Sequence, residues 1–234
     1  MTIPRNTSLA DATPAEQEEG GPEELGARER AKRDKQRRIA AAARQVIIDK
    51  GYEAATTREI AAEAGVSIGT VFVYARDKRD LLLMVVNDEL DALTEQGQAW
   101  VERAGPLLER LCGFFGERYR YWVAEPALSR PALGQTYELP EGAEAEELAS
   151  EQVRRFQQRR DIMLSQLRTM VLQAQASGEA AADLDPQRVA ALFMSLYVGE
   201  VRRWLQHPQP DASAGMKQLR AMLAVVMRGV SARD

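Results

Sequence analysis

The stretch AGVSIGTVFVYARDK, residues Ala64 to Lys78, decides how the rest of the chain is interpreted. Gly65 is typical of a helix end, because glycine adopts the left-handed backbone that closes a helix at little cost. Ser67 is a favoured residue at a helix start, where its hydroxyl can accept a hydrogen bond from a free backbone amide. The stretch therefore predicts a tight turn followed by a short helix from Ile68 to about Ala75.

Helix signals also surround this stretch. Upstream, residues 28–50 have apolar residues at helical spacing and bases elsewhere, and Gly51 is the expected stop. Thr56 and Glu59 have the spacing of a capping box, in which each side chain bonds the backbone of the other, so a helix is expected over residues 57–64. Downstream, Asp77 is the expected cap of a helix that continues to about residue 104.

Two short helices joined by a turn that contains one glycine match the helix-turn-helix, whose second helix enters the DNA major groove. Helical spacing turns Val71 toward the interior of this small unit, with Ala75 near it. Gly69, Thr70, Phe72 and Val73 then turn outward, so the outward face is mostly apolar.

Charge is unevenly distributed along the chain. Residues 1–27 carry one base and six acids, residues 28–80 thirteen bases and eight acids, and residues 81–234 seventeen bases and twenty-one acids. A basic block between acidic flanks is consistent with binding of a polyanion, and also with an ordinary solvated helix face. Residues 1–26 contain few large apolar side chains and are expected to be disordered.

The remaining segments are also helical in period, and no segment has the period of a strand, so we expect an all-α fold. Asp185 and Pro186 open a predicted helix over residues 186–206, and the last predicted helix spans 212–231. Residues 125–146, rich in Pro, Gly and Glu, are expected to form a short helix and a mobile loop. Two further apolar stripes comprise Leu108, Leu111, Cys112, Phe115, Tyr119 and Trp122, and Val153, Phe156, Met163, Leu167, Met170 and Val171.

Several classes of protein receive no support from the sequence. The apolar runs are shorter than the ~20 residues that span a bilayer, and the N-terminus lacks the apolar core of a secretory signal, so a cytoplasmic location is expected. One cysteine, Cys112, and one histidine, His207, leave no basis for a disulfide or a zinc site. No catalytic motif is evident, so neither an enzyme nor a cofactor or metal is predicted.

Residues 37–86 resemble the TetR family of transcriptional regulators, most closely in GYEAATTREIAAEAGVSIGTV and YARDKRDLL. Residues 183–205 are also similar to the penultimate helix of that family. Behind the acidic tail that composition indicates (1–27), the resemblance implies a helix-turn-helix DNA-binding domain (28–80) and a helical domain for ligand binding and dimerisation (81–234). It also implies a homodimeric repressor that binds a palindromic DNA operator and is released by a small-molecule inducer.

The family pattern places a set of residues at the DNA. Arg58 is suited to a bidentate guanine contact, Thr70 to a base contact, and Phe72 and Val73 to thymine methyl groups. Thr57, Tyr74 and Lys78 are placed at phosphates. The full predicted set is Thr57, Arg58, Ile68, Gly69, Thr70, Phe72, Val73, Tyr74 and Lys78.

The sequence departs from the family pattern at two positions, with Phe72 in place of the usual tyrosine and Ala75 in place of a bulky aromatic. Alternatives also remain at this stage. Phe72 and Val73 would be core residues if the helix were rotated, and Arg58 could be an ordinary exposed helix charge. The Arg28–Arg38 cluster is either an arm that reaches an adjacent groove or a solvated helix end.

In the helical domain, the resemblance suggests an inducer that is apolar or aromatic. The candidate ligand-binding residues are Trp100, Phe115, Tyr119, Trp122, Phe156, Met163 and Leu167. Such stripes also form ordinary cores. The candidate dimer residues are Leu192, Leu196, Val201, Trp204, Leu219, Leu223 and Val226, on two helices that could instead only seal their own domain. An architectural DNA-binding dimer that has no sequence preference and no ligand is the alternative function.

Overall fold

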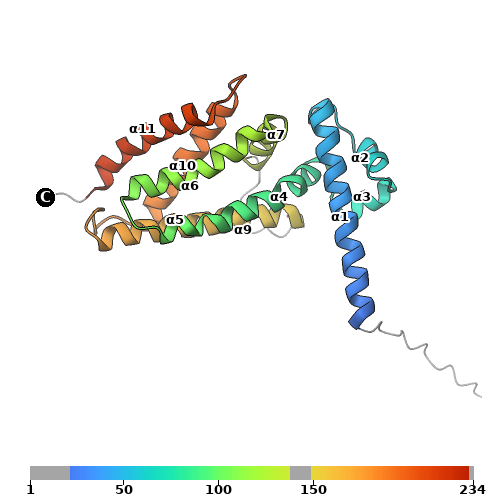
Figure 1. The fold of residues 1–234 in the computed structure, drawn as a ribbon, viewed down its shortest axis with the longest axis horizontal. Coiled ribbons are helices and arrows are strands. Elements are labelled where there is room, and N and C mark those ends of the chain that lie inside the picture. Colours follow the sequence, from blue (N-terminus) through green and yellow to red (C-terminus); the bar gives the residue numbers. More distant parts are fainter. Residues whose placement is uncertain (1–21, 138–148, 232–234) are drawn as a thin grey trace, which may run out of the picture. The chain divides into compact units, whose positions relative to one another are not determined.

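The computed structural model describes residues 22–137 and 149–231 (Figure 1). Within these ranges the secondary structure is helical apart from one isolated antiparallel bridge between Ala180 and Ser231, which confirms the all-α prediction. The helices are α1 (Pro22–Lys50), α2 (Thr57–Glu63), α3 (Ile68–Tyr74), α4 (Lys78–Gln96), α5 (Gln98–Glu102), α6 (Leu107–Ala124), α7 (Pro126–Tyr137), α9 (Glu151–Ala176), α10 (Pro186–Leu205) and α11 (Ala212–Val230).

The chain divides into two units, residues 1–36 and residues 37–234. In the described part of the first unit, α1 begins at Pro22, earlier than the expected start near Arg28. The rest of the predicted disordered tail, residues 1–21, lies outside the described residues. Arg33 and Glu29 form an exposed ion pair one turn apart along α1, which supports helix formation here.

The predicted caps are confirmed at the start of the three helices that follow α1. The Thr56 hydroxyl accepts from the Glu59 amide at 3.3 Å, and Glu59 accepts from the Thr56 amide at 3.1 Å, which completes the capping box of α2. Ser67 accepts from the Thr70 amide at 3.1 Å at the start of α3, and Asp77 caps α4. The chain therefore turns between α2 and α3 where the sequence indicated.

The expected continuous helix from Asp77 to about Ala104 is wrong, because it breaks at Gly97 into α4 and α5. A Cβ at Gly97 would lie only 2.8 Å from a ring carbon of Phe114 and 3.1 Å from the Thr94 carbonyl oxygen. The lack of a side chain thus permits close packing against α6 at the break. The helical periodicity of the sequence continues across residue 97, so the periodicity could not predict the break.

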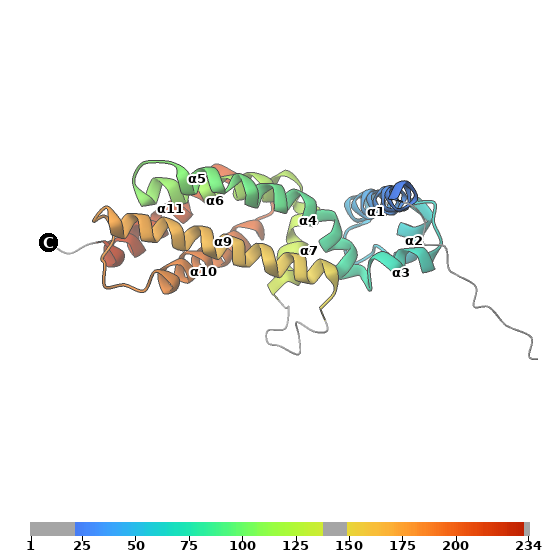
Figure 2. The same ribbon diagram turned by 90° about the horizontal axis from the view of Figure 1, so that it is seen from below.

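Residues 37–234 share a core that extends from α1 to α11. In Figures 1 and 2, α9 lies alongside α4 and α10, and α11 lies alongside α6. The close approach of α5 to α6 depends on Gly113, where a Cβ would lie 2.1 Å from Trp100. Gly215 likewise permits the close approach of α11 to α6, because a Cβ at Gly215 would lie 2.5 Å from Tyr119.

The predicted helices at the C-terminal end are confirmed as α10 and α11, with Asp185 and Asp211 as their caps. The short helix predicted after residue 125 is α7, which contains Pro131. The mobile loop predicted after it falls on residues 138–148, outside the described ranges.

Candidate nucleic-acid and ligand sites

The outward face of α3 is apolar and exposed. Val71 is fully buried and Ala75 is buried, whereas the side chains of Phe72 and Val73 are 51% and 76% exposed. The predicted rotation of this helix is therefore confirmed, and Phe72 and Val73 are not core residues. Large apolar side chains on a surface that faces only water are unfavourable, so this face is a candidate contact surface.

The other predicted DNA-facing residues lie on α2 and α3 and at the start of α4, and none of them is buried. Arg58, Ile68 and Gly69 are exposed, and Thr57, Thr70 and Tyr74 are partly exposed. The Thr70 hydroxyl lies 2.9 Å from the Ser67 hydroxyl, so the cap of α3 also orients the Thr70 side chain. Arg58 has a long, exposed side chain that can donate hydrogen bonds.

Lys78 is more constrained than the sequence suggested. Its ammonium donates to the Glu53 carbonyl oxygen at 3.0 Å and lies 4.5 Å from the centre of the Tyr52 ring. Partial burial, followed by the nearby Asp77 and Glu53 carboxylates, raises the pKa of Tyr52 to about 12. The Tyr52 phenol therefore stays neutral, and Lys78 is held in place against its ring.

Arg38, a member of the basic cluster, has a structural role that sequence reasoning missed. Its guanidinium donates to the Ala64 carbonyl oxygen at 2.6 Å, at the turn between α2 and α3. A Cβ at Gly65 would lie 3.1 Å from the same guanidinium, and Gly65 has a φ of 62°. Arg38 of α1 thus stabilises the turn between α2 and α3. The two ends of this contact are too far apart in sequence for a helical pattern to predict it.

Most of the predicted ligand-binding residues lie in the core of the helical domain. Phe115, Tyr119 and Leu167 are fully buried, and Trp122 is buried. Phe115 stacks on Tyr197 with ring centres 4.6 Å apart, and the Trp122 indole donates to the Tyr197 hydroxyl at 2.8 Å. These contacts show that the stripe forms a packed aromatic core on this side of α6.

Phe156, Met163 and Trp100 are only partly buried. Phe156 packs against a small separate cluster of Leu83, Ala149 and Val153. Trp100 borders an open cleft of about 700 Å³ between α5, α6 and α11, and no other predicted ligand-binding residue lines it. This cleft therefore takes in one member of the predicted set, and the role of the others stays a prediction.

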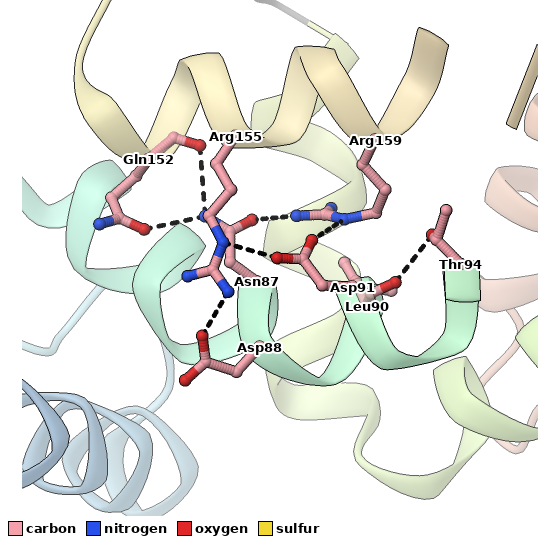
Figure 3. Close-up of polar contacts among 8 residues, drawn as sticks. All are labelled: Asn87, Asp88, Leu90, Asp91, Thr94, Gln152, Arg155 and Arg159. Atoms are coloured by element: carbon pink, nitrogen blue, oxygen red, sulfur yellow. Dashed lines mark hydrogen bonds and ion pairs between the residues drawn. The ribbon is translucent and has the colours of Figure 1, made fainter. Parts of the chain in front are cut away.

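Helix α4 joins α9 through a buried polar network (Figure 3). Arg159 donates to Asp91 at 2.8 Å and also to Asn87, while Asn87 donates to the Gln152 side chain at 2.9 Å. Arg155 completes the network with an ion pair to Asp91 at 2.6 Å. The network fixes α9 against the helix that directly follows the helix-turn-helix.

A second polar contact lies at the start of α4. Asp80 is buried, accepts from the Arg76 amide at 3.0 Å and accepts from the Ser150 hydroxyl at 2.5 Å. Ser150 is also the cap of α9. The last residues of the helix-turn-helix are therefore joined to the first turn of α9 through one carboxylate.

Four of the candidate dimer residues are buried within the protomer itself. Val201, Leu219 and Leu223 are fully buried within the protomer, and Trp204 is buried and donates to the Asp211 carbonyl oxygen at 2.8 Å. Helices α10 and α11 pack these side chains against α6 and α9. The apolar period of a helix does not show whether an apolar face packs inside the protomer or against a second copy. The outward apolar side chains of α10 and α11 are Leu192, Leu196, Met222, Val225 and Val226.

Two other kinds of feature are absent from the described residues. None of their helices is long and apolar enough to cross a membrane. Among the same residues, no group of three or more His, Cys, Asp or Glu side chains could hold a metal ion.

The fold and the exposed α3 face define a helix-turn-helix protein with a larger helical domain. Residues 39–85 match the family of bacterial regulatory proteins named tetR. The chain is 30% identical over 80 residues to the fatty acid metabolism regulator protein of Bacillus subtilis (strain 168), which is 34% of this chain and 41% of that protein. It is 27% identical over 185 residues to the transcriptional repressor KstR of Mycobacterium tuberculosis, covering 78% of this chain and 75% of that protein.

Solved structures share the fold. The FadR repressor of Thermus thermophilus, in complex with lauroyl-CoA, has a TM-score of 0.61 at 22% identity, covering 85% of this chain and 96% of that one. The helix-turn-helix region of the protein, residues 39–85, is therefore that of the tetR family of bacterial regulatory proteins, and the rest of the chain shares the fold of such regulators.

Proposed function

We propose that the protein is a homodimeric transcriptional repressor of the cytoplasm that binds a near-palindromic DNA operator and is released by a small-molecule inducer. The observation that carries this proposal is the exposed apolar face of α3, with Phe72 and Val73, together with the exposed Arg58 on α2. Residues 28–80 form the DNA-binding domain in this proposal, and residues 81–234 bind the inducer and form the dimer.

The chemistry of the α3 face suggests how bases are recognised. Arg58 can bond the two acceptors of a guanine, a contact that is worth ~1–3 kcal/mol of discrimination. Phe72 and Val73 can only make apolar contacts, which suit the methyl group of thymine. Thr57, Tyr74 and Lys78 are assigned to phosphates, which position the protein without reading sequence.

A second copy is needed because a palindromic operator presents two equivalent half-sites. The outward residues of α10 and α11, with Leu192 and Val225 at their centre, are the proposed contact. The side chain of Leu192 is 48% exposed and that of Val225 is 56% exposed, which leaves apolar surface that a symmetric partner can cover.

The inducer is proposed to have an apolar body. The inducer would bind at the aromatic core around Phe115, Trp122 and Tyr197. To make room for it, these side chains would have to move apart or pack around the ligand. The relatives support this choice, since one is named for fatty acid metabolism and a structural neighbour binds lauroyl-CoA.

Inducer binding has a direct route to the DNA-binding domain in this proposal. Asp80 joins the end of the helix-turn-helix to α9, and Arg159 joins α9 to α4. A ligand that shifts α9 would therefore change the position of both reading heads, within the limit set by its difference in affinity for the two states.

Protection mapping on DNA that flanks the protein's own coding sequence, followed by titration of the protected fragment, tests the proposal. We expect nanomolar to micromolar affinity that falls steeply with salt, and a protected near-palindrome. Arg58→Ala should cost about ten-fold or more in affinity and relax the preference at one base of each half-site. Glu63→Ala, an exposed change on the same helix, is the matched control.

The alternative is an architectural dimer that recognises DNA shape alone, which the mostly apolar α3 face favours. Under that alternative, Arg58→Ala and Val73→Ala leave the preferred sequence unchanged, and competitor DNA of random sequence displaces the fragment equally well. Either result would rule out the repressor.

A further inference from the structure

Arg118 is a buried guanidinium in the middle of α6. Its side chain donates through Nη1 to the Phe114 carbonyl oxygen at 2.8 Å, and its Cζ lies 4.0 Å from the centre of the Phe114 ring. The residue is only 3% exposed. Its Nη2 is buried and has no hydrogen-bond partner within the described part of the chain. One end of the guanidinium therefore has donors that the described residues do not use.

Among the residues that the structure describes, the charge of Arg118 also has no ion pair with an acid. The neighbouring Glu117 is paired instead with Arg120 at 2.6 Å, on the outside of α6. Burial lowers the pKa of Arg118 to about 10, so the group is still protonated at neutral pH. A buried charge without a partner is strongly unfavourable, and native proteins keep few such groups without a functional reason.

Arg159 of α9 supplies a second unused donor. Its Nε and Nη2 are bound to Asp91 and Asn87, but its Nη1 is buried without a hydrogen-bond partner in the described ranges. The positive charge of Arg159 contributes to lowering the Arg118 pKa, which places the two guanidiniums within electrostatic range of one another. Helices α6 and α9 are in contact, so the two donors belong to one region of the helical domain.

Aromatic side chains border this region. The Tyr197 hydroxyl accepts from the Trp122 indole at 2.8 Å, and the Tyr197 ring stacks on Phe115 with ring centres 4.6 Å apart. The surroundings of the guanidiniums are thus apolar with a few fixed polar groups, which is the usual character of a site for a small organic ligand.

We propose that Arg118 and Arg159 bind the carboxylate of an amphipathic inducer whose apolar body packs among the aromatic side chains between α6 and α10. This inference rests on the proposed function and adds the chemical class of the ligand. A carboxylate matches the flat fork of a guanidinium, and its negative charge balances that of Arg118, which has no ion pair with an acid in the described ranges. The bound carboxylate would remove the cost of the buried charge, so binding and stability are linked.

Binding of matched acids and alcohols to the full-length protein tests the inference. The pairs are dodecanoate with dodecanol, and 4-phenylbutyrate with 4-phenylbutanol, each below its aggregation limit. We expect at least one acid to bind ten-fold or more tightly than its alcohol, measured by calorimetry and by the rise in melting temperature. If both acids bind no better than their alcohols, the inference is wrong.

Variants at Arg118 identify the group responsible. Arg118→Met should lower the affinity for the bound acid at least ten-fold and change that for the alcohol less than two-fold, whereas Arg118→Lys should keep part of the preference. Arg120→Met, on the same helix but exposed, is the matched control and should change neither. An acid preference that survives in Arg118→Met would overturn the assignment. Should Arg118→Met not fold, Arg118→Lys and the wild-type comparison still decide.

Operator binding, measured on the same samples, separates this inference from the proposed function. Absence of sequence-specific DNA binding refutes the proposed function, whatever the acids do. Lauroyl-CoA tests the proposed function without the carboxylate, because its acyl group ends in an uncharged thioester. If lauroyl-CoA releases the operator while the acids show no preference over alcohols, the repressor stands and the carboxylate site fails.

Discussion

Single side chains at helix ends position the α3 face. Ser67 starts α3, and the pair of Thr56 and Glu59 starts α2. Glu59 also accepts from Lys50 at 2.6 Å, so it links the end of α1 to the start of α2. Hydrogen bonds from Lys50 and then from Thr56 lower the pKa of Glu59, because they stabilise its charged form.

Glu59→Gln should therefore destabilise the protein in a way that depends on pH. Because the pKa of Glu59 is lower in the folded protein, its contribution is present above the unfolded pKa and is lost as pH falls through the folded value. We expect the wild type to melt above the variant at neutral pH, with the gap closing in acid below the ordinary range of glutamate. Melting curves across this range check it, with Glu63→Gln as control. A gap that does not change with pH would contradict the assignment.

At this scale, sequence patterns predict local bonds well and long-range polar contacts poorly. Ser67, Thr56 and Asp77 were predictable because a cap and its amide lie within three residues. Arg118 and Arg159 were not, because helical period assigns charged residues to the solvent side. The contact of Arg159 with Asn87 joins residues 72 apart in sequence, which no local pattern can show.

At the scale of elements, helices approach closely only where a glycine permits it. In α6, a Cβ at Gly113 would lie 2.1 Å from Trp100, whereas at Gly116 the nearest atom would be 3.9 Å away, on Arg120. The two positions share a helix and differ in the space that a methyl group would find.

Gly113→Ala and Gly116→Ala should consequently have opposite effects. The first forces Trp100 or α5 to move and should cost about 1–3 kcal/mol of the free energy of unfolding. The second adds helix propensity without a clash and should be neutral or stabilising by up to about 1 kcal/mol. Urea unfolding measures both, and equal effects would contradict the packing described for α5.

The network between α4 and α9 supplies a second element-scale test. Asp91 is the carboxylate that pairs the buried Arg159, whereas Asp88 makes only an exposed pair with Arg155. Asp91→Ala should destabilise by about 3 kcal/mol, because it leaves a buried charge unpaired. Asp88→Ala should cost less than about 1 kcal/mol, as surface pairs do. The same unfolding measurement compares them, and similar losses would show that Arg159 finds another partner.

At the scale of the whole molecule, the sequence predicted an all-α chain, the helices that carry the proposed interface and some of its residues, such as Leu192, but it placed buried residues such as Leu219 in the same set. An apolar stripe records that a helix has buried faces without recording which partner covers each one. Helix α11 has two such faces. Leu219 and Leu223 face its own protomer, while Met222 and Val225 face outward.

Val225→Asp should therefore yield a monomer, since a charge would be placed in the proposed contact between copies. Ile162→Asp, on α9 with a side chain that is 51% exposed, is the control and should leave the dimer intact. Analytical ultracentrifugation reports the mass, and operator titration should show at least a ten-fold loss for the first variant only. A dimer that persists in Val225→Asp would move the interface elsewhere.

The exposed pair Phe72 and Val73 has a further consequence if it reads methyl groups. Thymine and 5-methylcytosine carry a methyl group at the same ring position, on the same wall of the major groove. A surface that selects by apolar contact responds to that group rather than to the hydrogen-bonding identity of the base. Epigenetic marking of cytosines inside the operator would then change its occupancy with no change in its sequence.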